Sequence, residues 1–570
     1  MPEIKCERSP RPNAWEYALA GLALVVCFGL RIAYIYHYRF DSDEPQHLHV
    51  VWEWLQGGIA YRNFFDNHVP LFHLLSAPIL KLTGERADAL LWMRLWQLPV
   101  FASSLFLTHR ISSLLFSKRV ALWSAVFLGL YPYYFFPTIE FRPDNLWGLT
   151  WLAALWVALS GGLGLKRSFA VGLILGLDFS FSMKTSLLLA SGMLAVIGSF
   201  VALPKLRATS PRVIVATVAT GLAGLLVVPA ALLLYFSSQG ALQSLYQCVI
   251  KHNLVAASTT GHARWIQILS VIPVFGGLWW CARRIAKASH DETVATRRVL
   301  VFLIAGTFLT LLHGFWGIIT RQDFIPNDPL LVLLVTPLIF EGARRLSGKF
   351  SRADVAVPSL VFIPVLLVVG VVWILLGRSL RLKETQGQIR YVSEVLSLTG
   401  PHDYVMDFKG EAIFRHRPYY YVLEPMTRMH IKSGTIVDDI PQRMIDTKTC
   451  VALAVTHRHS ARTENFIRSN YLQVSQVRVA GRFVEPSADG AFVFDIKVSV
   501  AYVLMDRNGL VSGKLDGTQT TGTCTLSAGS HRFEPARKIG GKLAVFLEPA
   551  WKKGFSPFYP VPFEKFESEF

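Results

Sequence analysis

The sequence predicts a polytopic α-helical membrane protein that carries a soluble α/β and β-rich region after its helices. Three observations predict this fold class. Hydrophobic residues make up 52% of the 570 residues and the mean hydropathy is +0.38, which is too apolar for a soluble chain of this length. Apolar runs of about twenty residues, enough to cross a hydrocarbon core, recur between Ala14 and Gly377. From about residue 380 the composition becomes that of a soluble domain.

About eleven apolar segments have the length that a membrane-spanning helix needs. They are residues 15–37, 89–109, 120–137, 145–163, 169–183, 185–203, 213–236, 265–282, 299–318, 329–343 and 355–377. The first segment is long and runs into a polar stretch without the Ala-x-Ala site of a cleaved signal peptide. We therefore expect it to be retained as a span.

The positive charges indicate the topology. If the N-terminus is inside, every inside connection is basic, as the positive-inside bias requires. The inside basic residues are Lys5, Arg8, Arg11, Arg110, Lys118, Arg119, Lys166, Arg167, Lys205, Arg207, Arg212, Arg283, Arg284, Lys287, Arg297, Arg298, Arg344, Arg345, Lys349 and Arg352. The formal net charge of +18 is therefore explained by topology, and no nucleic-acid partner is expected.

The opposite face receives the longer connections and everything after Arg378. One of these connections is expected to hold an interfacial helix that begins after Asp66-Asn67, has Pro70 in its first turn and runs to Leu82, because its apolar residues recur at helical spacing. We expect three domains, residues 1–378, 379–490 and 491–570. The second should be α/β, with helices over 380–398 and 462–469 and strands over 404–406 and 451–455, and the third should be β-rich with Gly-rich turns.

Ionisable residues gather on this expected outer face. The stretch Phe40–His47 holds three carboxylates within four residues directly after the first span. Near other span ends lie Asp66, His68, Glu140, Arg142, Asp144, Lys184, Arg321 and Asp323. Carboxylates in such a place can take a proton from a nucleophile, and cations can hold an anionic leaving group such as a phosphate. The simpler explanations are a solvated acidic loop and basic side chains that reach lipid head groups.

The same residues resemble the GT-C class of membrane glycosyltransferases, in the branch that contains protein O-mannosyltransferases and the aminoarabinose transferase of lipid A. The resemblance covers residues 15–345. It rests on several short motifs that occur in the same order as in the family and that all fall on the same side of the membrane. These are Ser42-Asp43-Glu44, Phe65-Asp66-Asn67-His68-Val69-Pro70-Leu71, Glu140-Phe141-Arg142-Pro143-Asp144, Gly176-Leu177 with Lys184, Lys251-His252-Asn253 with Gly261-His262, and Arg321-Gln322-Asp323-Phe324-Ile325-Pro326.

The resemblance implies that a sugar moves, with inversion, from a polyprenyl-phosphate carrier to a glycan, lipid or protein acceptor at the outer face. Asp43 would be the general base for the acceptor hydroxyl, and Glu44 would support or orient it. The resemblance and the shared face together give further roles. Donor-phosphate binding is assigned to Arg142, Lys184, Arg321 and His68, and substrate binding to Asp66, Asn67, Glu140, Asp144 and His252.

The family has a Lys before a Pro-Pro pair in this segment. In this chain Asn67 or His68 stands at the position of that Lys. Asp66 with His262 resembles the carboxylate–histidine metal pair of the lipid A branch, although two ligands do not make a metal site. No cofactor is required by the pattern, and a divalent metal at this pair stays an alternative. Asp41 matches an Asp-x-Asp metal motif of other glycosyltransferases and is treated as secondary.

Two other functions compete with an enzyme. A transporter or flippase of lipid-linked sugars would use the same charges to line a path, and a receptor or scaffold would not need Asp43. Transporters often show internal repeats and ionisable residues in the middle of spans. Here the span centres are mostly apolar, with Asp178 the main exception, so an enzyme is favoured. We expect a bacterial inner membrane with the site and the C-terminal domains facing the periplasm, an endoplasmic-reticulum setting being the alternative.

Overall fold

The computed structural model describes residues 11–162, 164–203, 210–254, 261–289, 291–350, 357–378 and 380–564. The chain divides into two compact units. The first, called the helical unit here, consists of Met1–Tyr38, Asn67–Phe72 and Met93–Leu382. The second, called the loop-and-sheet unit, consists of Arg39–Asp66, His73–Trp92 and Lys383–Phe570.

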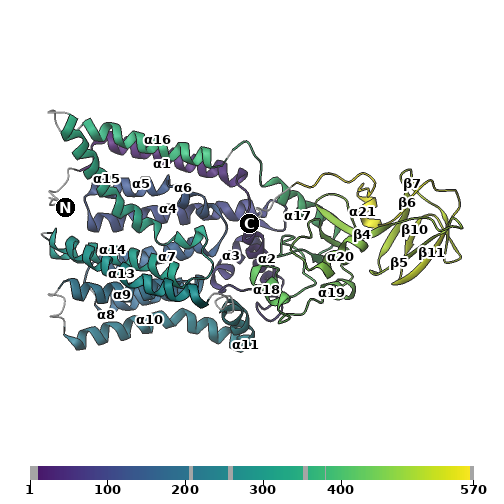
Figure 1. The fold of residues 1–570 in the computed structure, drawn as a ribbon, viewed down its shortest axis with the longest axis horizontal. Helices are drawn as coiled ribbons and strands as arrows, with labels where there is room; N and C mark the ends of the chain where they lie inside the picture. The colour runs from purple at the N-terminus through teal and green to yellow at the C-terminus, as the bar shows by residue number, and fades with distance from the viewer. Residues whose placement is uncertain are drawn as a thin grey trace. The chain divides into compact units, whose positions relative to one another are not determined.

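A helix covers each of the eleven expected spans, and Figure 1 shows these helices running alongside one another. Their bounds are α1 Ala14–His37, α4 Ala89–Leu115, α5 Lys118–Gly129 with α6 Pro132–Phe135, α7 Pro143–Leu159, α8 Leu165–Phe181, α9 Thr185–Ala202, α10 Pro211–Ser238, α13 Gly261–Lys287, α14 Glu292–Phe315, α15 Asp328–Phe350 and α16 Val357–Gly377. Within the described residues, five helices are long and apolar enough to cross a membrane, or six if the pair bent by 62° near Leu130 is one span.

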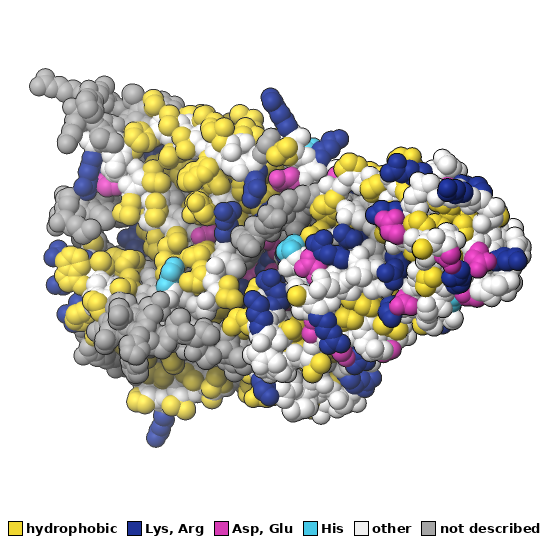
Figure 2. Space-filling model, turned by 45° about the vertical axis from the view of Figure 1, so that its right-hand side comes forward, with side chains coloured by type: hydrophobic (Ala, Val, Ile, Leu, Met, Phe, Trp, Pro, Cys, Tyr) yellow, Lys and Arg dark blue, Asp and Glu magenta, His cyan; other side chains and the backbone are white. Residues whose placement is uncertain are grey.

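The outward surface of the helical unit is apolar. Figure 2 shows hydrophobic side chains gathered on the left-hand part of the molecule, over the helices. Large apolar side chains of this unit, such as Leu226 and Val368, are 60% exposed. Apolar surface of this extent needs a hydrocarbon environment, because water would penalise it. The chain is therefore an integral membrane protein, as the sequence predicts.

Short elements connect these helices. They are the 3₁₀ turns η1 Pro137–Ile139 and η5 Arg321–Phe324, the short helices α11 Leu242–Leu245 and α12 His252–Leu254, and the π-helical turn η3 Tyr246–Lys251. Arg31 of α1, fully buried, donates hydrogen bonds to the Phe135 carbonyl and to Thr138 Oγ1, both at 3.1 Å. A buried guanidinium that satisfies backbone carbonyls in this way fixes η1, and η1 leads directly into Glu140.

The loop-and-sheet unit contains two sheets. The larger has the order β1-β2-β4-β12-β6-β10, with β3 beside β4 and β7 beside β6, and the smaller has the order β5-β11-β8-β9. The strands are β1 Val405–Met406, β2 Val451–Leu453, β3 Tyr471–Gln473, β4 Val477–Val484, β5 Phe492–Ile496, β6 Ala501–Asp506, β7 Gly509–Leu510, β8 Gly513–Leu515, β9 Thr518–Thr520, β10 Thr523–Thr525, β11 Gly529–Pro535 and β12 Leu543–Leu547. The pair β1–β2 is parallel and the other pairs are antiparallel.

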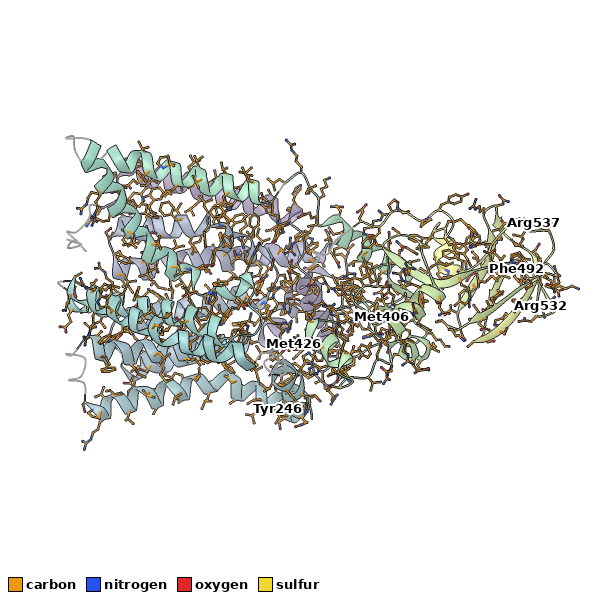
Figure 3. The ribbon with its side chains drawn as sticks, in the orientation of Figure 1. Tyr246, Met406, Met426, Phe492, Arg532 and Arg537 are labelled. Carbon is orange, nitrogen blue, oxygen red and sulfur yellow. The ribbon has the colours of Figure 1, made fainter. Side chains whose placement is uncertain are left out.

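The larger sheet crosses the domain boundary expected at residue 490. Strand β12 pairs with β4 on one side and with β6 on the other, so residues on both sides of the boundary share one sheet. The smaller sheet lies wholly after that boundary, and Figure 3 labels Phe492 of β5 and Arg532 of β11 in it. Its strand β5 alternates buried and exposed residues, the pattern of a sheet with one solvated face.

Helices of the loop-and-sheet unit are α2 Asp43–Leu55, α17 Gln386–Leu398, α18 Pro425–Lys432, α19 Ile440–Asp446, α20 Ala461–Asn470 and α21 Glu548–Lys552. The helix expected to begin after Asp66-Asn67 is α3, Leu71–Thr83, which begins only after Pro70. The helix expected from residue 380 begins only at Gln386. Helix α2 was not expected, because the acidic residues at its start are typical of a polar loop. Their negative charges are nevertheless favourable there, because the N-terminal end of a helix dipole is positive.

Candidate functional site

The candidate residues fall into two groups, one in each unit, and each group is described by itself. In the helical unit, Lys184 is the centre of a buried polar cluster. Its Nζ lies 3.2 Å from Asp144 Oδ1 and 2.5 Å from Asp323 Oδ1. Arg142 Nε donates to Asp144 Oδ2 at 3.3 Å. Asp144 and Asp323 are only 3% and 1% exposed, so each depends on its cationic partner to offset the loss of hydration.

Helix starts hold these side chains in place. Arg142 and Asp144 flank Pro143, which begins α7 and has the backbone angle that a first helical turn requires. Lys184 directly precedes α9, at its N-cap position, and Asp323 lies in η5. Three connections that are far apart in the chain therefore meet at one cluster of charges.

Glu140 joins the cluster through amide side chains. Gln322 Nε2 donates to Glu140 Oε2 at 2.8 Å, and Asn145 Nδ2 donates to the Glu140 carbonyl at 2.8 Å and to Gln97 Oε1 at 3.3 Å. With Glu140, three carboxylates face two cations. A phosphate that bound at this cluster would therefore have to share Lys184 and Arg142 with Asp144. The phosphate and the Asp144 carboxylate, both anions, would compete for the same two cations.

The other candidates of the helical unit lie on other segments of the chain. Arg321 is exposed, and among the described residues it has no ion-pair partner; its guanidinium carbon lies 6.0 Å from the centre of the Tyr133 ring. His68 is half-buried and His252, in α12, is buried. Asn253, beside His252, donates from Nδ2 to the Asn67 carbonyl at 3.0 Å, so Asn67 lies next to α12.

In the loop-and-sheet unit, Asp43 is held by a residue that the sequence did not single out. Lys409 Nζ bonds Asp43 Oδ1 and donates to Ser42 Oγ at 3.3 Å. The Asp43 side chain is 24% exposed, whereas that of Lys409 is 6% exposed. The carboxylate of Asp43 is thus fixed by an ammonium group while part of it stays accessible.

Glu44 and Asp41 shape the turn that presents Asp43. Glu44 is fully buried, and its Oε1 accepts from the Asp41 backbone N–H at 2.8 Å. Asp41 Oδ1 in turn accepts from the Asp43 N–H at 3.1 Å. The second bond satisfies a backbone donor of the first turn of α2, and the first ties the residue before the N-cap to that turn, so both acids position the start of α2.

The residues Asp66, His73 and His47 form a buried row in this unit. Asp66 Oδ2 lies 3.3 Å from His73 Nδ1, and His73 Nε2 lies 3.0 Å from His47 Nδ1, with all three side chains fully buried. Sequence reasoning paired Asp66 with His262, whose side chain lies outside the described residues. Within the described part of the chain, no group of three or more side chains is arranged to hold a metal ion.

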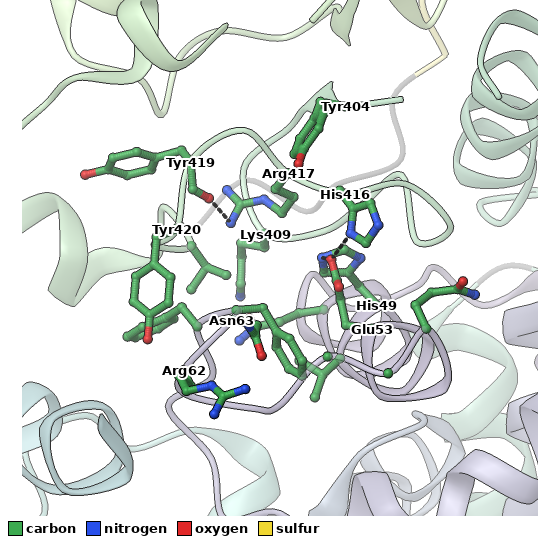
Figure 4. A pocket seen from close by; sticks show the side chains of 18 residues that line it. His49, Glu53, Arg62, Asn63, Tyr404, Lys409, His416, Arg417, Tyr419 and Tyr420 are labelled. Carbon is green, nitrogen blue, oxygen red and sulfur yellow. Dashed lines mark hydrogen bonds and ion pairs between the residues drawn. The ribbon is translucent and has the colours of Figure 1, made fainter. Parts of the chain in front are cut away.

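A cavity of about 450 Å³ lies within the loop-and-sheet unit (Figure 4). Its lining comes from α2, from the segment that follows it, from Tyr404 directly before β1, and from the loop after β1. The lining residues are Gln46, His49, Val50, Glu53, Gln56, Gly57, Gly58, Arg62, Asn63, Phe64, Phe65, Tyr404, Lys409, His416, Arg417, Tyr419, Tyr420 and Val422. Lys409 therefore contacts the cavity and Asp43 at once. One feature of the sequence could have pointed to Lys409: it lies in the loop that follows a short strand, and such loops often carry functional groups.

Glycine is needed beside Lys409. Gly410 has φ +100°, and a Cβ on it would lie 2.7 Å from the His49 side chain. Asp407 closes the same loop, since its carboxylate accepts from the Gly410 N–H at 2.9 Å and from the Ala412 N–H at 2.8 Å. The loop thus brings the Lys409 backbone close to α2.

Glu53 and His416 form a charged pair at the cavity wall, with His416 Nδ1 2.9 Å from Glu53 Oε1. The hydrogen bond to Glu53 raises the pKa of His416. Burial raises the pKa of Glu53, but the hydrogen bond with His416 and the charges of His49 and Arg417 outweigh it and leave that pKa lowered. Burial lowers the pKa of His49, whose Nδ1 lies 2.8 Å from the Ile413 carbonyl.

No protein-family model and no curated protein sequence matches this chain. Among solved structures, it is similar to the oligosaccharyltransferase of Archaeoglobus fulgidus tethered to an acceptor peptide with the NVT sequon (9% identity, TM-score 0.44). It is also similar to the apo form (10%, 0.44) and to AglB of that organism in complex with an inhibitory peptide and a dolichol-phosphate (10%, 0.41). Each comparison covers 84% of this chain and 74% of the other. At these values the likeness assigns no activity to this chain.

Proposed function

We propose that the chain is a GT-C-type glycosyltransferase that moves a sugar from a polyprenyl-phosphate carrier to a glycan, lipid or protein acceptor. The observation that supports this most is the partly exposed carboxylate of Asp43, which is fixed by Lys409, a residue that also lines a polar cavity. A carboxylate held in one position and still accessible is what general-base catalysis requires.

In the proposed reaction the acceptor hydroxyl attacks C1 of the carrier-linked sugar. Asp43 takes the hydroxyl proton as the new C1–O bond forms. The bond between C1 and the phosphate oxygen breaks on the opposite side, and its electron pair leaves with the carrier phosphate, so the configuration at C1 inverts. Holding the donor phosphate is a role separate from this step; the candidates that the sequence offers for it are Arg142, as a planar fork, and Lys184, as a point charge.

No cofactor takes part in this scheme, and a divalent metal near Asp66 stays a separate alternative that chelation can test. The proposed setting is a membrane whose outer face carries the loop-and-sheet unit, with the bacterial inner membrane and its periplasm as the expected case. The basic inside connections support this sidedness.

The test uses the purified full chain in lipid nanodiscs with undecaprenyl-phosphate monosaccharides labelled in the sugar, and with membrane lipids and glycans as acceptors. Release of free carrier phosphate with transfer of the label is expected. Asp43→Asn should lower the rate by about 10²–10⁴, because it removes the proton acceptor. Asp489→Asn makes the same chemical change at a half-exposed residue of the β-rich region and should leave the rate unchanged.

Full turnover in Asp43→Asn would contradict the proposal. A flippase gives a different result, since it would move the labelled lipid across a vesicle membrane without releasing carrier phosphate. Turnover that survives EDTA would remove the metal alternative.

A further inference from the structure

The cavity in the loop-and-sheet unit has the size of a small-molecule site. Its volume of about 450 Å³ lies within the range of about 300–1,000 Å³ that ligand pockets span. All the residues that line it belong to one compact unit. The chemistry of its wall can therefore be argued without reference to the helical unit.

The wall presents both hydrogen-bond acceptors and donors. Within the described part of the chain, Glu53 Oε2, His416 Nε2, Asn63 Nδ2 and the Tyr404 hydroxyl have no hydrogen-bond partner, although each side chain lines the cavity. Glu53 is also 93% buried, so its second oxygen has little access to solvent except through the cavity. A ligand hydroxyl, which donates and accepts at once, satisfies such a mixed set best.

Aromatic rings supply the other part of the wall. Tyr404, Tyr419, Tyr420 and Phe65 line the cavity, and the rings of Phe65 and Tyr420 meet edge to face at 5.8 Å. Figure 4 shows Tyr404, Tyr419 and Tyr420 around the loop that carries Lys409 and Arg417. Aromatic faces offer apolar area at a small cost in conformational entropy and suit the C–H face of a sugar ring.

Two cations at the cavity, Lys409 and Arg417, are already engaged by acids of the protein. Lys409 bonds Asp43, and Arg417 donates from Nε to Asp407 Oδ1 at 2.8 Å and from its other nitrogens to backbone carbonyls. A phosphate or carboxylate ligand would meet the Glu53 carboxylate, a like charge, in this space. Arg62 is exposed at the rim. The charges therefore favour a neutral polyhydroxyl ligand over an anionic one.

We propose that this cavity binds a neutral hexose ring, with Glu53 Oε2 and Asn63 Nδ2 holding ring hydroxyls and the tyrosine rings covering its apolar face. Lys409 connects this site to Asp43, so the ring bound here belongs to the acceptor whose hydroxyl Asp43 deprotonates. That acceptor role rests on the function proposed above. The sugar site itself rests only on the cavity.

The experiment measures binding separately from turnover. Full-length protein is placed in lipid nanodiscs, because maltoside detergents carry glucose head groups that would occupy the site. Saturation-transfer NMR is recorded with methyl α-D-mannopyranoside, with methyl β-D-glucopyranoside, and with methyl β-D-glucuronide as the anionic probe. At least one neutral glycoside should give a saturable signal, and the glucuronide should give a weaker one.

Two variants and a control locate the signal. Glu53→Gln should weaken binding about tenfold, because a hydrogen bond to a charged acceptor is replaced by a neutral one. Tyr404→Phe removes only a hydroxyl and should weaken binding a few-fold, which keeps the test valid if Glu53→Gln folds poorly. Glu534→Gln, in the exposed part of β11, should bind as the wild type does.

The proposal would be overturned if neither neutral glycoside gave a saturable signal with the wild-type protein. It would also be overturned if both cavity variants bound the glycoside as tightly as the wild type does, or if the glucuronide bound more tightly than the neutral glycosides. Carrier-phosphate release, measured on the same nanodiscs, separates the two proposals. Sugar binding without any release supports the cavity site and overturns the glycosyltransferase function. Release without sugar binding does the reverse.

Discussion

At the scale of single residues, the Glu53–His416 pair makes the stability of the loop-and-sheet unit depend on pH. The raised pKa of His416 means that its contribution is complete below about pH 6.5, the unfolded value, and is lost as pH rises through the folded pKa. The lowered pKa of Glu53 means that its contribution is complete above about pH 4.3 and is lost as pH falls through the folded pKa. We expect His416→Gln to lower the unfolding midpoint more at pH 5.5 than at pH 8.5, measured by intrinsic fluorescence.

The matched control is His402→Gln, which changes an exposed histidine and should show no such difference between the two pH values. An effect of His416→Gln that is the same at both values would contradict the role of the charged pair. Residue type, sidedness and the family resemblance led to Asp43, Asp144 and Lys184 as candidates, and their roles stay predictions. The partner of Asp43 was not predictable, because Lys409 lies 366 positions away and a pairing so distant is decided by the fold.

At the scale of elements, close packing of α8 against α10 depends on glycines. A Cβ on Gly172 would lie 1.9 Å from the Gly221 carbonyl oxygen, and one on Gly176 would lie 2.5 Å from the Leu225 carbonyl oxygen. Gly172 and Gly176 are four residues apart on one face of α8, the spacing that lets two membrane helices approach closely. Gly172→Ala should therefore force the helices apart and destabilise the chain by about 1–3 kcal/mol, seen as a lower thermal midpoint in nanodiscs.

Gly192→Ala in α9 is the matched control, because no atom lies within 4 Å of the added methyl group and alanine favours a helix by about 1 kcal/mol. Equal midpoints for the two variants would contradict the packing argument. The presence of helices over the expected apolar segments was predictable, because an apolar run of sufficient length has few alternatives in a membrane. Helix α2 and the sheet order were not, since the acids of α2 resemble a loop and strand pairing joins distant segments.

At the scale of the whole molecule, the loop-and-sheet unit is assembled from both ends of the chain. Residues 39–66 and 73–92 belong to it together with everything after Leu382. The contacts between these stretches include His416 Nδ1 to Glu53 Oε1 at 2.9 Å, His49 Nδ1 to the Ile413 carbonyl at 2.8 Å, and Arg415 Nη1 to Glu85 Oε2 at 3.3 Å. Most of these groups are buried, so separating them would leave polar atoms unsatisfied.

This assembly predicts that the chain stays together after it is cut. A protease site inserted between Leu382 and Lys383 divides the chain at the boundary of the two units. After cleavage in nanodiscs, the fragment 383–570 should remain bound to residues 1–382 through their shared unit and co-elute with them in size-exclusion chromatography. The uncut protein with the same insertion is the control. Arg415→Ala combined with His416→Gln should release the fragment more readily, because both side chains bond acids of the N-terminal stretches. Separation of the fragments in the otherwise unaltered chain would show that residues 39–66 and 73–92 do not form one folded unit with residues 383–570.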